Sequence, residues 1–183
     1  GKMGNALAEE AARLGATVHL VSGPVASYPK NSGVILHKVE TAQEMLKAVL
    51  ELKEMADITI MAAAVADYKP VEISEQKIKK EDEHLIIKLE KTTDILKAVG
   101  DSKPTDQILV GFGLETENGV ANAKAKLAKK NLDLIVLNSP NDQNSAFGHD
   151  TNKVTIITAD NKMKAYELMA KSEVAKEIFR CVL

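Results

Sequence analysis

The sequence is short of the features that mark secreted, membrane-spanning and metal-cluster proteins. It holds a single cysteine, Cys181, which excludes disulfides within the chain and cysteine-rich metal sites. Its apolar runs fall well below the roughly 18 residues that a transmembrane helix needs, and its first residues do not resemble a signal peptide. We therefore expect a cytoplasmic protein with no membrane partner, and a structural role for Cys181, which falls in an apolar helical pattern.

An excess of one charge is also missing. Lys and Arg number 24 against 26 Asp and Glu, for a net charge of −2, so no overall field attracts nucleic acid or a membrane. A polyanion would need a local site. The chain has no G-x-S-x-G motif of a nucleophilic hydrolase. Its histidines, His19, His37, His84 and His149, are scattered rather than spaced as metal ligands.

What is present is a regular alternation of apolar strands and amphipathic helices. With 183 residues, 45% of them apolar, the chain fits one domain with a substantial core and shows no repeat or linker. The alternation predicts a three-layer, Rossmann-like α/β fold with a mostly parallel sheet. Antiparallel additions are expected at an excursion that includes 84–89 and at a sheet edge formed by 153–158 with 163–164. The other expected strands are 17–21, 33–39, 58–63, 107–112 and 132–137.

Helix boundaries carry their own signals. The first helix ends at Gly15, and Thr41 with Glu44 forms a capping box before the second. Thr92, Thr93 and Asp94 precede a short helix that contains Ile95, Leu96 and Val99. A helix over 118–130 turns Val120, Ala123 and Leu127 inward. Ser172 is the expected cap of the last helix, whose Ala175, Ile178, Phe179 and Val182 cover the core.

The stretch from Met61 to Lys80 is the strongest candidate for a binding site. A buried strand ends there and Asp67 follows at the sheet edge, where open α/β sheets bind ligands. A basic arm then leads to Lys77 and the lysines after it. A cationic arm beside a carboxylate suits a nucleotide triphosphate and its metal ion. The alternative is a solvated loop of mixed charge, because Glu75 and the acidic residues at 81–83 largely neutralise the lysines.

Two further features allow a ligand without requiring one. Lys126 and Lys130 lie four positions apart, along one flank of their helix, so both ammonium groups could reach one ligand. At the front, Gly1-x-x-Gly4 could be the tail of a dinucleotide-binding turn. That interpretation also needs an acidic residue after the second strand, and the chain has Ser22 followed by glycine and proline there.

Several motifs in a fixed order resemble one family over essentially the whole chain. They are GKMG at 1–4, LVSGP at 20–24, AAVADY at 63–68, KIKK at 77–80, TTDIL at 92–96, GFGLET at 111–116 and KKNLDLIVLN at 129–138. In this order they are similar to the bacterial phosphopantothenate-cysteine ligases of coenzyme A synthesis.

The resemblance implies a reaction in two steps. Such ligases use CTP to turn the carboxylate of 4′-phosphopantothenate into an acyl-cytidylate with loss of pyrophosphate, and the amine of cysteine then displaces CMP. A carboxylate is a poor electrophile, and joining it to a phosphate supplies a leaving group. The protein's share is positioning and stabilisation of phosphate charge.

The resemblance also assigns residues. Lys77 matches a catalytic lysine of the mobile arm that serves acyl-cytidylate formation, and Asp67 matches a nucleotide-binding carboxylate that also helps to place Mg²⁺. The other positions that match nucleotide contacts are Thr93, Asp94, Ile95, Leu96, Phe112, Lys126 and Lys130. Lys2, Ser22 and Gly23 are notable for location alone.

Parts of the family pattern are not in this sequence. Family members carry a first strand, a glycine-rich phosphate loop and an asparagine-bearing segment before GKMG, so we expect an N-terminal segment upstream of Gly1. Many also carry a flavin-dependent decarboxylase domain. The family forms homodimers, and 84–89 is the candidate contact. Two other classes stay open: an NAD(P)-linked Rossmann oxidoreductase, and a nucleotide-binding regulatory module without turnover. Related ligases elsewhere use ATP.

Overall fold

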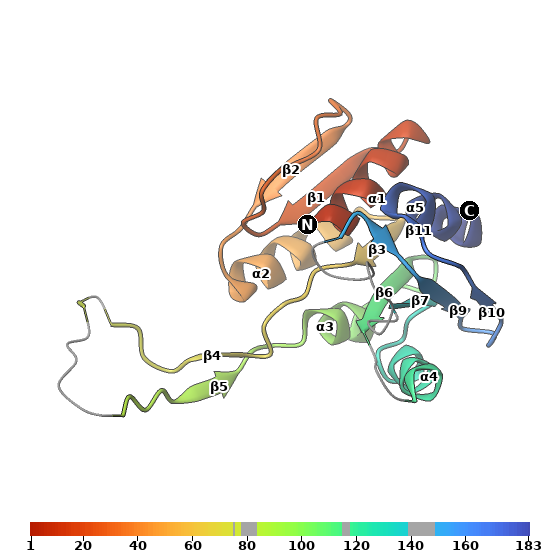
Figure 1. The fold of residues 1–183 in the computed structure, drawn as a ribbon. Coiled ribbons are helices and arrows are strands. Elements are labelled where there is room, and N and C mark those ends of the chain that lie inside the picture. Colours follow the sequence, from red (N-terminus) through yellow and green to blue (C-terminus); the bar gives the residue numbers. More distant parts are fainter. Residues whose placement is uncertain (75, 78–83, 115–117, 139–148) are drawn as a thin grey trace.

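The fold is built around a five-stranded sheet in the order β10-β9-β7-β6-β3. The structure, a computed structural model, describes residues 1–74, 76–77, 84–114, 118–138 and 149–183 (Figure 1). The sheet strands β3, β6 and β7 run parallel, while β9 and β10 complete one side in antiparallel pairing. This mixed sheet confirms the predicted fold class. The strand bounds are β3 Ile58–Met61, β6 Ile108–Leu114, β7 Leu134–Asn138, β9 Val154–Thr158 and β10 Met163–Ala165.

Three smaller pairs surround this sheet. Strands β1 (Val18–Ser22) and β2 (Val34–Lys38) pair in parallel as a sheet of their own. A short antiparallel pair joins β8 (Thr151–Asn152) to β11 (Met169–Ala170), just before the last helix. The third pair belongs to an arm that is described below.

Helices α1 (Lys2–Arg13) and α5 (Lys171–Val182) pack on one face of the sheet. Their apolar stripes meet side chains of β6, β7 and β9, because alternate residues of each strand point to this face. The resulting buried cluster contains Met3, Leu7, Val110, Leu134, Val136, Val154, Ile156, Val174, Ala175, Ile178 and Phe179.

Helices α2 (Ala42–Lys53), α3 (Ile95–Asp101) and α4 (Gly119–Lys129) form the layer on the other face. They bury the remaining strand residues, which completes the predicted three layers. This second cluster contains Met45, Val49, Ile95, Val99, Leu109, Ala123, Leu127, Leu132, Ile135, Leu137 and Ile157. No helix in the described part of the chain is long and apolar enough to cross a membrane.

The helix ends test the capping predictions. Thr41 and Glu44 form the expected capping box, in which the Glu44 amide donates to Thr41 Oγ1 over 3.1 Å. Gly15 follows α1 with a φ of +88°, which glycine tolerates without strain. The prediction for Ser172 is wrong. Helix α5 already begins at Lys171, with Ala170 as its N-cap and no side-chain cap bond.

Two helix residues lie away from the core: Val120, which was expected to point inward, and Cys181, for which a structural role was expected. Cys181 is exposed, although it lies seven residues after the buried Val174 and so on nearly the same side of α5. The core does not extend to this side of the last helical turn. Val120 is 37% exposed, so the inward stripe of α4 starts one turn later, at Ala123.

An arm leaves the body after β3 and returns at α3 (Figure 1). Its base is the antiparallel pair of β4 (Tyr68–Pro70) with β5 (Leu89–Lys91). The predicted excursion is therefore confirmed, but its strand lies at 89–91 rather than 84–89. The two strands pair next to the body, where backbone hydrogen bonds join the outgoing and returning segments of the arm. Of the KIKK motif, the structure describes Lys77, and the rest lies outside the described residues.

Candidate functional site

The candidate site starts where the base of the arm meets the carboxyl end of β3. The amide of Thr92 donates to the carbonyl of Asp67 over 2.9 Å, and the Thr92 hydroxyl donates to the carbonyl of Ala66 over 2.5 Å. These bonds fix the segment that carries Asp67 beside the segment that leads into α3. The Asp67 and Thr93 side chains stay exposed at this junction.

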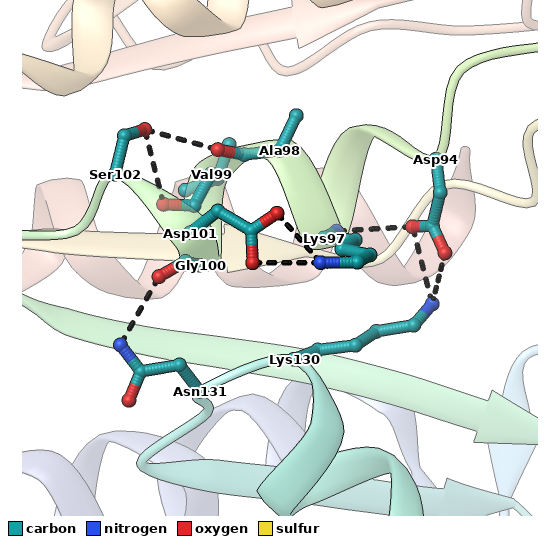
Figure 2. Close-up of polar contacts among 9 residues, drawn as sticks. All are labelled: Asp94, Lys97, Ala98, Val99, Gly100, Asp101, Ser102, Lys130 and Asn131. Atoms are coloured by element: carbon teal, nitrogen blue, oxygen red, sulfur yellow. Dashed lines mark hydrogen bonds and ion pairs between the residues drawn. The ribbon is translucent and has the colours of Figure 1, made fainter.

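An ion pair joins the start of α3 to the end of α4 (Figure 2). Asp94 is the N-cap of α3 and accepts from the amide of Lys97 over 3.0 Å. Lys130, just past α4, places its ammonium 2.8 Å from the other carboxylate oxygen of Asp94. The Lys130 side chain is only 18% exposed. Two residues 36 positions apart in the sequence are thus brought together.

Asp94 stays ionised because its partners outweigh its partial burial. Burial alone would raise the pKa of this carboxyl group, but the hydrogen bonds from Lys130 and from the Lys97 amide hold the pKa below its usual value. The carboxylate therefore keeps both its capping role and its ion pair near neutral pH. A ligand anion that takes Lys130 must compete with this carboxylate.

The apolar residues among the predicted nucleotide contacts, Ile95 and Leu96, lie next to this corner. Ile95 is 3% exposed and belongs to the second core cluster. Leu96 lies against β6 at Gly111, where an added Cβ would come within 2.9 Å of the leucine side chain. Without a side chain at Gly111, Leu96 can pack onto the strand. This places Ile95 in a structural position and Leu96 at the edge of the site.

A second hydrogen bond holds the same two helices, and it was not predicted from the sequence. Asn131 donates from its side-chain amide to the carbonyl of Gly100 over 3.0 Å (Figure 2). Asn131 has a φ of +51°, the left-handed conformation that asparagine adopts readily after a helix. An asparagine directly after KK was the available signal. This hydrogen bond fixes the distance between α3 and Lys130, the residue before Asn131.

The remaining predicted residues lie on β6, on α4 and on the arm. Phe112 pairs with Val136 and packs against the first core cluster, on the face that α1 and α5 cover. Lys126 is half-buried on α4, one turn before Lys130. Lys77 is exposed and belongs to the arm, which extends away from the body (Figure 1). The structure thus gathers Asp67, Asp94 and Lys130 near one junction and leaves Lys77 outside it.

The arrangement holds little metal-binding capacity of its own. Within the described ranges, no three His, Cys, Asp or Glu side chains cluster closely enough to hold a metal ion. Asp67 offers one exposed carboxylate. Such a site suits Mg²⁺, which proteins often bind through one or two carboxylates together with the phosphates of a substrate. The donor set therefore fits a metal ion that arrives with its nucleotide.

Fold and site together define a Rossmann-like α/β domain with a charged corner at the carboxyl edge of its sheet, where open α/β sheets bind ligands. The family model of the DNA/pantothenate metabolism flavoprotein C-terminal domain matches residues 1–183, and the chain belongs to this family. The resemblance inferred from the motifs is thereby confirmed.

Curated relatives match nearly the whole of this chain but are longer than it. The coenzyme A biosynthesis bifunctional protein CoaBC of Bacillus subtilis (strain 168) is 45% identical over 181 residues, which are 98% of this chain and 44% of that protein. A protein of an unknown prokaryotic organism, named cysteine/cysteine sulfinic acid decarboxylase, is 46% identical over 100% of this chain and 51% of its own length. The chain thus spans about half the length of these relatives.

Solved structures match over the whole fold. The crystal structure of the C-terminal domain of CoaBC has a TM-score of 0.83 at 40% identity, covering 100% of this chain and 81% of that domain. A Cab2 variant in complex with phosphopantothenate-cysteine has a TM-score of 0.78 over 99% of this chain and 77% of its own. Its 16% identity supports the fold alone.

Proposed function

We propose that this chain is a cytoplasmic, CTP-dependent phosphopantothenate-cysteine ligase. The observation that carries the proposal is 40% identity to the C-terminal domain of CoaBC over the full chain. In the proposed reaction the carboxylate oxygen of 4′-phosphopantothenate attacks the α-phosphorus of CTP, pyrophosphate leaves, and the amine of cysteine then displaces CMP. The proton released by that amine passes to solvent.

The geometry supports a division of labour among the predicted residues. Asp67 and Thr93 face solvent at the junction where the arm meets the body, so both are accessible to a nucleotide. Lys130 supplies positive charge next to them, and Lys126 lies one turn away on α4. Leu96 offers an apolar contact at the same corner. Mg²⁺, bound with the nucleotide through Asp67, would supply charge neutralisation on the phosphates.

The alternatives are less well supported by this chain. A Rossmann oxidoreductase would be expected to have an acidic residue after β1 for the cofactor ribose, but Ser22 lies there with its side chain buried against Gly23. The decarboxylase name belongs to a relative of which this chain covers 51%, so the name describes a protein about half of which has no counterpart in this chain. Neither the oxidoreductase nor the decarboxylase activity is as well supported for this chain as the ligase activity.

A nucleotide-dependent release assay tests the proposal. Pyrophosphate is expected when the purified protein, Mg²⁺, CTP and 4′-phosphopantothenate are combined, with ATP in place of CTP as the comparison. Adding cysteine should yield CMP and a product with the mass of the amide. Release of pyrophosphate without the acid substrate, or tight binding of NADPH with no binding of CTP, would contradict the ligase.

We further propose that two copies of the chain associate through the arm. The apolar side chains of Ile73, Leu85, Ile86, Ile87 and Leu89 are between 55% and 88% exposed, and all of them belong to the arm. A separate two-stranded pair is at best marginally stable in water, so these side chains need a cover. Self-association through a shared strand pair would supply both the cover and further backbone hydrogen bonds.

Ile86→Lys is expected to shift the protein from dimer to monomer, because a charge would be buried at the contact without a partner. Light scattering measures the mass, and far-ultraviolet circular dichroism checks that the fold persists. Met55→Lys is the matched control, because Met55 is 69% exposed and follows α2, so it is not part of the arm. The arm is not the contact if Ile86→Lys stays dimeric, and the proposal fails if the parent protein is a monomer.

A further inference from the structure

Two of the four histidines meet in the structure, although their spacing in the sequence does not predict it. His19 lies on β1 and His37 on β2, and their rings stack with centroids 5.2 Å apart and an angle of 24° between the ring planes. His19 Nδ1 and His37 Nε2 are 2.9 Å apart, a hydrogen-bond distance. The contact therefore joins two imidazole nitrogens, and imidazole is the commonest metal ligand in proteins.

The register of the strand pair explains why these rings meet. His19 lies directly opposite Ile35, and His37 lies directly opposite Val21. Since alternate residues of a strand point to the same face, the two histidines lie diagonally across one face of the β1–β2 pair. Backbone pairing runs along the whole of both strands, so it holds the two rings within reach of each other.

Solvent reaches this pair of rings. His19 is exposed and His37 is half-buried. Ile35, which lies on the same face and opposite His19, is 46% exposed, so this part of the face is open. A buried pair of histidines would serve packing, whereas this pair is accessible to an ion from solution.

The distance between the two nitrogens selects among metal ions. An imidazole nitrogen binds a divalent transition metal at about 2.0–2.1 Å, so two such bonds at a right angle place their nitrogens about 2.9 Å apart. Bonds at a tetrahedral angle, as zinc prefers, place them about 3.3–3.4 Å apart. The observed 2.9 Å thus matches neighbouring positions of a square-planar or tetragonal site, the geometry of Cu²⁺ and Ni²⁺ with nitrogen and oxygen ligands.

Water completes the coordination of such an ion, because the described residues include no group of three His, Cys, Asp or Glu side chains that could hold a metal. Each ring binds as a neutral imidazole, through the nitrogen that now faces the other ring. One of these two nitrogens carries the proton of the present hydrogen bond. That nitrogen releases its proton, and the second nitrogen of the same ring takes one up from water. Metal binding therefore replaces one hydrogen bond with two coordinate bonds and leaves the net protonation unchanged.

We propose that His19 and His37 form a binding site for a divalent copper or nickel ion, held by both imidazole nitrogens in neighbouring positions. The ion cross-links β1 and β2, which pair with each other and with no other strand in the described part of the chain. It therefore reinforces a part of the fold that has no backbone pairing with the main sheet. This inference does not depend on the proposed ligase function.

Calorimetric titration of the untagged protein with Ni²⁺ tests the site. His19→Ala and His37→Ala each remove one of two linked ligands, so each should raise the Kd for Ni²⁺ by about 100-fold. His84→Ala removes an exposed histidine of the arm and is the matched control, which should leave this Kd unchanged. Mg²⁺ prefers oxygen ligands, so its titration should not distinguish the parent from either variant of the pair.

Two further measurements report the ligands and the cross-link. Electron paramagnetic resonance of the Cu²⁺ complex should show hyperfine splitting from two imidazole nitrogens in the parent and from one in His19→Ala or His37→Ala. Saturating Ni²⁺ should raise the Tm of the parent more than that of either variant, because an ion that binds only the folded state stabilises it. The inference is overturned if the Kd for Ni²⁺ is unchanged in either variant, if His84→Ala weakens binding as much, or if the parent spectrum shows a single nitrogen.

Discussion

Replacing Lys77 with glutamine is expected to slow pyrophosphate release by about 10²-fold or more, the usual effect of removing a preorganised charge from a transition state. The α-phosphorus of the nucleotide gains negative charge on its oxygens as the carboxylate attacks, and an ammonium group on the arm would offset it. Lys77 is exposed and outside both core clusters, so the fold should be unaffected. Single-turnover measurement of pyrophosphate gives the rate of this step directly.

Lys88→Gln is the matched control for the charge of the arm. Lys88 is also exposed, and its backbone carbonyl accepts from the amide of Val71, so it lies near the base of the arm rather than at Lys77. Its replacement should leave the rate within about twofold, the usual range for a surface change. Equal losses in both variants would show that total arm charge matters, and an unchanged rate in Lys77→Gln would remove Lys77 from the mechanism.

Gly100→Ala should destabilise the protein by about 3 kcal/mol and disturb the site at the same time. A Cβ at this position would lie 1.9 Å from the backbone carbonyl oxygen of Lys130, and backbone cannot move aside as a flexible side chain can. The end of α3 must then shift away from Lys130, which strains the Asn131 bond and the ion pair with Asp94 (Figure 2). Thermal unfolding should show a Tm lower by about 6–12 °C.

Gly4→Ala tests the same substitution where no contact opposes it. Gly4 lies in α1, and a Cβ there meets nothing within 4 Å. Alanine favours a helix over glycine by about 1 kcal/mol, so this variant should be slightly more stable than the parent. If Gly100→Ala unfolds at the same temperature as the parent, α3 and the end of α4 are less closely fitted than their geometry indicates.

The elements that the sequence predicts well are those with strong local signals. The capping box at Thr41, the positive φ of Gly15 and the edge pair of β9 with β10 all follow from residue type and spacing. Positions near helix ends were harder. The exposure of Cys181 and Val120 depends on how far the sheet extends beneath each helix, and periodicity carries no information about that length.

The site was predictable to the extent that motifs identify it. The start of α3 at Asp94 follows from N-cap chemistry, but its ion pair with Lys130 needs the α4 helix to end beside it. The hydrogen bond between Asn131 and Gly100 joins residues that are distant in sequence, so no local pattern shows it. Phe112 illustrates the opposite limit, because its motif gives a position on β6 but not the face that its ring occupies.

Hydrogen bonds at the base of the arm connect the segments that carry Asp67 and Asp94. Thr92 donates hydrogen bonds to the carbonyl groups of Ala66 and Asp67, and Asp94 is the N-cap of α3 two residues later. The segment that carries Asp67 and the segment that leads to Asp94 are therefore joined at Thr92. Loss of the Thr92 hydroxyl would remove one of the two bonds that set the spacing between these two carboxylates.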